Sequence, residues 1–116
     1  MAKKKNKGKN TAIVGEFARY FGDNTLENWH RLIRDIGLDE NPPTINKCRQ
    51  VIKKVNVNIY DLLEAVAQGT HPQHFGTIGL LAQYSIRNRK IYPSQMAKKD
   101  KVGPVRALLR GLFGGS

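Results

Sequence analysis

The chain has 116 residues, with 20 Lys or Arg against 9 Asp or Glu, which gives a formal net charge of +11. This length suits one domain, and no run of about 18 apolar residues is present that could cross a membrane. The single cysteine, Cys48, excludes an internal disulfide and suits a reducing compartment, so we expect an intracellular protein.

The positive charge is concentrated at the two ends of the sequence. Residues 1–10 carry five lysines and no acid, residues 11–86 sum to −1, and residues 87–116 sum to +7. A run of like charges without apolar residues cannot build a core, so we predict a disordered basic tail over 1–10. A helical domain is predicted over 11–93.

Helical spacing of apolar residues predicts the first two helices. The first begins with Thr11 as N-cap and ends at Gly22. The second has a capping box made by Asn24 and Glu27, and Gly37 stands at its expected C-terminus. These signals are local and leave the packing of the two helices open.

Three further short helices are predicted before residue 93. After the loop 38–43, Thr44 can cap a third helix that carries Cys48 on its apolar stripe. Residues 55–59 alternate like a strand, but Asn58 favours a turn and a fourth helix that ends at Gly69. Residues 75–84 give a fifth helix that contains two glycines.

The last part of the chain is predicted to be separate from the domain. Residues 94–101 have the mixed charge of a linker, and residues 102–113 form an amphipathic helix. Its apolar arc could fold back on the domain, bind a partner protein or lie on an anionic membrane. The arc consists of Val105, Leu108, Leu109, Leu112 and Phe113. The fold class is therefore all-α, an irregular bundle of four or five short helices plus a C-terminal amphipathic helix.

Seven pieces of the chain form a recurrent pattern: Tyr20 to Asn24, Leu26 to Gly37, Cys48-Arg49, Val57 to Glu64, Phe75, Tyr84-Ser85 and Arg89 to Pro93. In these pieces the chain resembles a family of small fungal proteins of unassigned function. The family pattern has Cys-Arg where this chain has Ile33-Arg34. The resemblance implies a fungal source and a shared helical body, and it brings no activity, cofactor or catalytic residue.

No constellation for catalysis or metal binding is present. Cys48 lies on an apolar stripe, which favours a packed thiol over a nucleophile. His71 and His74 lie three apart in a turn, and a zinc site would also need ligands such as His30. We therefore predict a protein that is not an enzyme and uses no metal or cofactor.

The basic ends favour binding of nucleic acid or another polyanion without sequence preference, because lysines and arginines neutralise phosphates and tyrosines stack on bases. Tyr84 is instead favoured as a core residue. The predicted nucleic-acid contacts are Lys3, Lys4, Lys5, Lys7, Lys9, Arg87, Arg89, Lys90 and Tyr92. A loose import pattern at residues 4–7 favours the nucleus over the cytoplasm. The alternative is a protein-protein interaction module that uses the helical body or the C-terminal helix, and a membrane partner is not expected.

Overall fold

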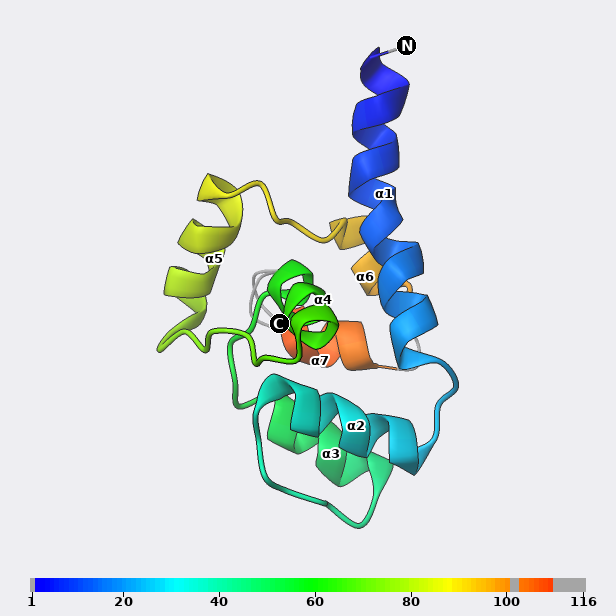
Figure 1. Ribbon diagram of the computed structural model, residues 1–116, viewed down its shortest axis with the longest axis vertical. Coiled ribbons are helices and arrows are strands. Elements are labelled where there is room, and N and C mark those ends of the chain that lie inside the picture. The colour runs from blue at the N-terminus through cyan, green and yellow to red at the C-terminus, as the bar shows by residue number, and fades with distance from the viewer. Residues whose placement is uncertain (1, 101–102, 110–116) are drawn as a thin grey trace.

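Seven helices follow one another in the computed structural model, which describes the backbone of residues 2–100 and 103–109 and the side chains from residue 11 onward within those ranges (Figure 1). No strand is present in these ranges, so the predicted all-α class is confirmed. The helices outnumber the prediction because a short helix replaces the expected linker.

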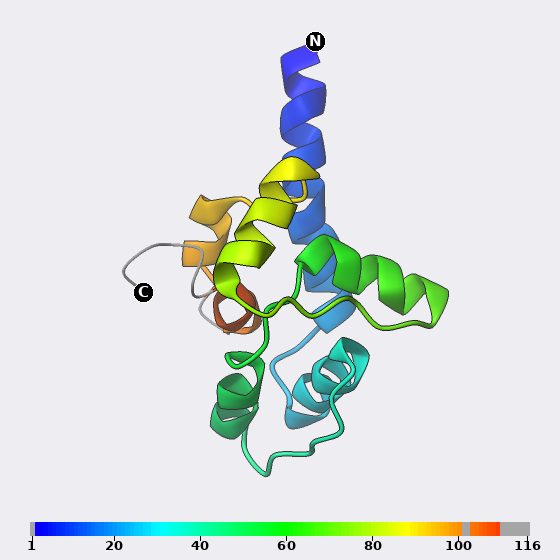
Figure 2. The same ribbon diagram turned by 90° about the vertical axis from the view of Figure 1, so that its left-hand side faces the viewer.

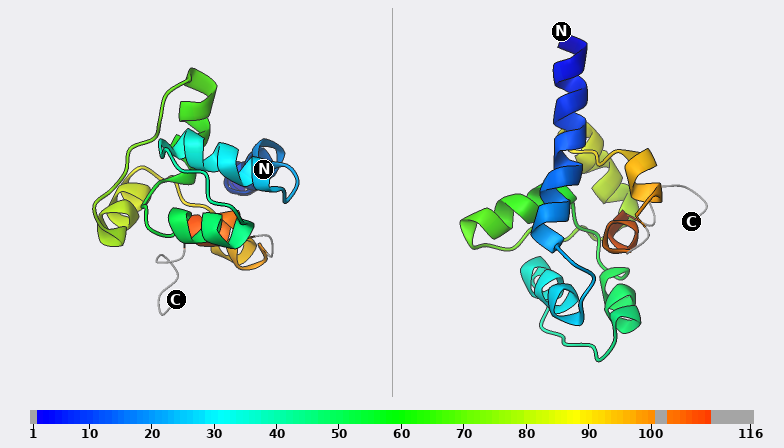
Figure 3. Two further views of the ribbon diagram at one scale, coloured as in Figure 1. Left: turned by 90° about the horizontal axis from the view of Figure 1, so that it is seen from below. Right: turned by 90° about the vertical axis from the view of Figure 1, so that its right-hand side faces the viewer.

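Helix α1 spans Ala2–Phe21 and is longer than predicted. Its C-terminal half buries Ile13, Phe17 and Phe21, and Gly22 ends it with a φ of 74°. Residues 2–10, for which we predicted a disordered tail, continue the helix as an arm that projects beyond the body (Figures 1 and 3). The physical reason is that an anchored helix needs no new nucleus, so each added residue gains a hydrogen bond.

Helix α2 spans Leu26–Ile36 and forms the centre of the core. The Thr25 hydroxyl accepts a 3.2 Å hydrogen bond from Asn28 N and is the N-cap. The predicted cap, Asn24, instead accepts a 2.7 Å hydrogen bond from the buried indole of Trp29. The capping box was therefore wrong by one residue, whereas the left-handed C-cap at Gly37, with a φ of 101°, is confirmed.

Helices α3, Ile45–Ile52, and α4, Ile59–Gln68, begin at the predicted caps. Thr44 caps α3, Asn58 caps α4, and Gly69 ends α4 in the left-handed conformation. Residues 53–58 between the two helices form a turn and not a strand, as we predicted. Helix α2 packs against α3 and α4, and α4 also packs against α1.

Helix α5 spans Ile78–Arg87 and stands at the side of the bundle (Figures 1 and 2). Its N-cap is Thr77, so it begins later than the predicted Phe75. Phe75 instead contacts Tyr84, with ring centroids 4.9 Å apart. Leu81 and Ser85 are the buried residues of α5, so one narrow face joins this helix to the body.

The C-terminal region is part of the domain. Helix α6, Ser94–Lys98, lies where we predicted a linker, and α7, Pro104–Leu109, packs against α3 and α6. The Asp100 carboxylate accepts hydrogen bonds from Val105 N at 2.7 Å and Arg106 N at 3.2 Å, and so caps α7. The linker prediction was wrong because the packing of α7 on α3, far away in the sequence, leaves no signal in the local pattern.

The described part of the C-terminal apolar arc folds back on the body, one of the three alternatives that the sequence left open. Val105, Leu108 and Leu109 are at most 5% exposed. These three side chains therefore cannot serve as a partner-binding face, and that prediction is corrected. Leu112 and Phe113, the other residues of the arc, lie outside the described residues.

Candidate functional site

The segment 87–93 joins α5 to α6 and carries most of the predicted contacts outside the N-terminal arm. The side chain of Asn58, itself buried, positions this segment by donating hydrogen bonds to Lys90 O at 2.9 Å and to Ser85 Oγ at 3.0 Å. The Tyr60 hydroxyl adds a 3.0 Å hydrogen bond to Ile91 O. The start of α4 therefore holds both the end of α5 and the segment that follows.

Helix α5 ends in a Schellman motif in which the left-handed residue is Arg89. Lys90 N donates to Ser85 O at 2.9 Å and Arg89 N donates to Ile86 O at 3.2 Å. Arg89 has a φ of 56°, and no other described residue except glycine has a positive φ. A side chain in this region costs roughly 1–2 kcal/mol, which is why glycine usually occupies it.

Arg87 and Arg89 are the free cations of the segment. Both side chains are exposed, and neither forms a salt bridge with a described residue. Strained positions persist where surrounding structure fixes them, and they cluster at functional sites. The strained and exposed Arg89 therefore marks this end of α5 as a candidate binding site.

Lys90 is engaged within the protein. Its ammonium lies 2.7 Å from Asp61 Oδ1 and donates a 3.3 Å hydrogen bond to the Tyr84 hydroxyl. The hydrogen bond to Asp61 raises the pKa of Lys90 to about 12. Lys90 holds the segment against α4, and Asp61 balances its charge, so it is not one of the free cations that we predicted for phosphate contacts.

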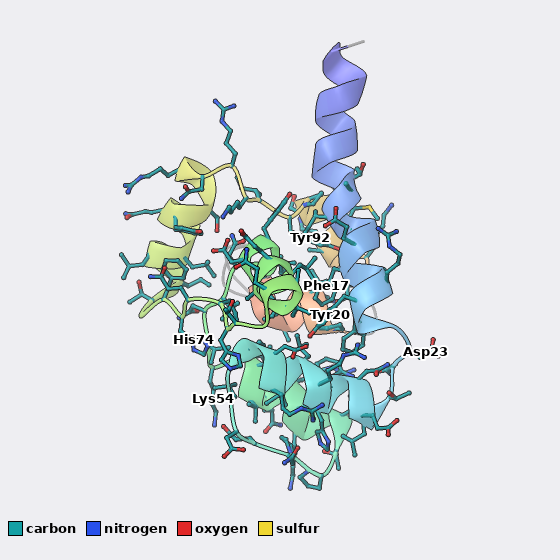
Figure 4. The ribbon with its side chains drawn as sticks, viewed as in Figure 1. Phe17, Tyr20, Asp23, Lys54, His74 and Tyr92 are labelled. Carbon is teal, nitrogen blue, oxygen red and sulfur yellow. The ribbon has the colours of Figure 1, made fainter. Side chains whose placement is uncertain are left out.

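Tyr92 is buried at 7% exposure and packs in the core near Phe17 (Figure 4). Met96 of α6 lines the same depression as these two rings. The ring of Tyr92 leaves no open face for a base, so the predicted stacking role was wrong. The sequence did not reveal this because the neighbours of Tyr92 come from α1 and α6. Tyr84, which the sequence favoured as packed, contacts Phe75 and Lys90.

The lysine-bearing arm and the free arginines lie toward the same end of the molecule. The N-terminal half of α1 projects past the body on the side where α5 ends, in two views at right angles (Figures 1 and 2). Lys3, Lys4, Lys5, Lys7 and Lys9 belong to this arm, whose backbone is described and whose side chains are outside the described set. Two cationic segments far apart in sequence thus share one end.

The cysteine and histidines have structural partners. Cys48 is fully buried in the core, and burial raises the pKa of its thiol. His74 Nε2 donates to Ile36 O at 2.7 Å, and His71 Nδ1 lies 3.3 Å from Asp35 O, so both rings meet the C-terminus of α2. Among the described residues, no three potential ligands gather as a metal site.

Comparisons with known proteins add no relative to this picture. No family model, curated protein or solved structure gives a significant match to the chain. Within the residues that the structure describes, no helix combines the length and apolarity needed to cross a membrane.

Proposed function

We propose that this protein is a non-enzymatic binding protein whose basic segments contact nucleic acid, or another polyanion, without sequence preference. The observation that carries the proposal is the exposed, strained Arg89 beside Arg87, at the same end of the molecule as the arm that bears five lysines. Exposed cations attract phosphates by their charge, and binding releases the counterions condensed on the nucleic acid.

Fewer residues are candidates for contacts with a polyanion than the sequence alone indicated. Arg87 and Arg89 remain, together with the lysines of residues 3–9, while Lys90 and Tyr92 serve the fold. Without an open aromatic ring in this segment, base stacking contributes little. We therefore expect a similar affinity for single strands, duplexes and a sulfated polysaccharide such as heparin at equal charge density.

The test is fluorescence anisotropy with labelled single-stranded and duplex oligonucleotides of scrambled sequence. Replacing both Arg87 and Arg89 by Gln should weaken binding about tenfold, because two phosphate contacts are lost. Arg34→Gln is the matched control, since Arg34 is exposed on α2. Equal affinities for the double variant and the control would refute the proposal for this segment.

A second candidate function is a protein-interaction module that uses the helical body. Ile86 and Ile91 are 66% and 51% exposed, and they flank a surface depression beside the free arginines. Aliphatic side chains of this size suit a protein partner better than a nucleobase. The test is whether this surface binds an amphipathic peptide.

A further inference from the structure

Two adjoining depressions form an apolar groove between α4, α5, the segment 87–93 and the end of α7. Their volumes are about 260 Å³ and 440 Å³, and they share the side chains of Ile86, Ile91, Tyr92 and Ser94. The deeper one also contacts Leu81 and Leu109. The groove lies beside α5, which stands at the side of the bundle (Figure 1) and buries only Leu81 and Ser85.

The polar groups at the floor of the groove are already satisfied. The amide of Asn58 donates to Ser85 Oγ and Lys90 O, and Ser85 Oγ donates to Leu81 O at 2.8 Å. The Tyr60 hydroxyl donates to Ile91 O. A molecule in the groove therefore meets mainly apolar surface, so burial of aliphatic side chains would stabilise its binding.

The border of the groove is cationic. Arg89 lines the shallower depression, and Arg87 is exposed on the same helix end. Among the residues that the structure describes, no carboxylate lines either depression, and the nearby Asp61 is held by Lys90 at 2.7 Å. This distribution favours a partner that combines aliphatic side chains with negative charge.

Charge also argues against other occupants. A second copy of this chain would bring a further net charge of +11, which opposes association. The chain's own residues 110–116 contain Arg110 and no acid, so their charge does not complement the arginines. A nucleobase would need an open aromatic ring, whereas Tyr92 is buried.

We propose that this groove binds an acidic amphipathic segment of a partner protein, with its aliphatic side chains on Ile86 and Ile91 and its carboxylates on Arg87 and Arg89. The inference rests on the second candidate function and specifies its partner. Docking of an apolar helix face into a groove is a recurrent mode of peptide recognition.

The test uses the full chain, labelled with ¹⁵N, and a fluorescent amphipathic peptide of about 15 residues, which provides several helical turns, with Leu at helical spacing and Glu elsewhere. Anisotropy gives the affinity, and amide shifts locate the site. We expect shifts over residues 78–92 and a loss of affinity of about tenfold or more when Ile86 and Ile91 are both replaced by Ser.

Matched controls distinguish binding in the groove from nonspecific hydrophobic association. Leu80→Ser removes an aliphatic side chain that is 51% exposed on α5 outside the groove lining, and it should leave the affinity within about twofold. A peptide with Lys in place of Glu should not bind. A peptide with the same Glu content but Ser for Leu should bind weakly and independently of Ile86.

The outcomes distinguish the two levels of the proposal. A neutral peptide, with Leu at the same positions and Ser in place of Glu, is the decisive comparison. If it bound the groove as tightly as the acidic peptide, the protein-interaction function would stand and the acidic partner would be overturned. Absence of binding by every peptide would overturn both. Binding of vesicles containing phosphatidylserine that depends on Ile86 and Ile91, without peptide binding, would replace the protein partner with an anionic lipid surface.

Discussion

The side-chain amide of Asn58 donates a 2.9 Å hydrogen bond to the carbonyl oxygen of Lys90, thirty-two positions later in the chain. The same side chain caps α4 through a 3.1 Å hydrogen bond that its oxygen accepts from Asp61 N. One buried residue therefore starts a helix and fixes the backbone of the segment that carries Arg89. The proposed binding surface is built on this contact.

Replacing Asn58 by Ala should destabilise the protein by about 2–3 kcal/mol, because it removes a helix cap and leaves the part-buried Lys90 carbonyl without its donor. Urea denaturation measures this free energy of unfolding. Thr44→Ala, at the exposed cap of α3, is the control and should cost only about 1 kcal/mol. Similar costs for the two variants would show that the long-range hydrogen bonds of Asn58 add nothing.

Replacing Arg89 by Gly should stabilise the protein by about 1 kcal/mol, because glycine adopts a positive φ without steric cost. The same variant should bind polyanions more weakly, since a free cation is lost. Arg89→Ala is the matched control, because it loses the charge and keeps the backbone strain. If Arg89→Ala stabilised the protein as much as Arg89→Gly, the claim that the backbone at Arg89 is strained would be contradicted.

Replacing Leu108 by Ala should cost about 2–5 kcal/mol of stability, because the side chain is fully buried between α7 and the body. Arg106→Ala on the exposed side of the same helix should change stability by less than about 0.5 kcal/mol. Thermal or urea unfolding compares the two. If both variants were equally stable, α7 would not be part of the core.

Stability should fall as the pH rises above about 10. The pKa of Tyr20 is raised above 10.0 by burial and by its 2.5 Å hydrogen bond to Asp35, and that of Lys90 rises from 10.5 to about 12. Both groups hold their protons more tightly in the folded state, so their stabilisation is complete below the unfolded pKa and is lost as the pH rises through the folded pKa.

Tyr20→Phe isolates one part of this alkaline transition. The variant loses a hydrogen bond at every pH, yet its stability should fall less steeply between pH 10.0 and about 12, by up to one proton or about 1.4 kcal/mol per pH unit. Urea midpoints measured across this range give the slope. A slope equal to that of the parent would contradict the assignment to Tyr20.

Features set by neighbouring residues could be predicted from the sequence. Thr44 and Asn58 cap helices because their side chains accept hydrogen bonds from amides three residues on, and Gly37 and Gly69 end helices because they adopt a positive φ. The burial of Cys48 followed from helical spacing. None of these features depends on a distant partner.

Features set by distant contacts could not be predicted in this way. The burial of Tyr92 depends on its neighbours in α1 and α6, and Lys90 forms an ion pair with Asp61, twenty-nine positions away. Arg89 has no local signal for a positive φ, because arginine rarely adopts it. The candidate site at residues 87–93 therefore lies in a part of the chain whose conformation the local sequence pattern does not indicate.

The most direct test of the account is the salt dependence of binding to a duplex oligonucleotide, for the full chain and for a variant that lacks residues 2–10. If the five lysines of the arm contact phosphates, the slope of log K against log salt concentration should be less steep in the variant by up to about 4.5. Identical slopes for the two proteins would contradict the claim that the basic arm binds polyanions.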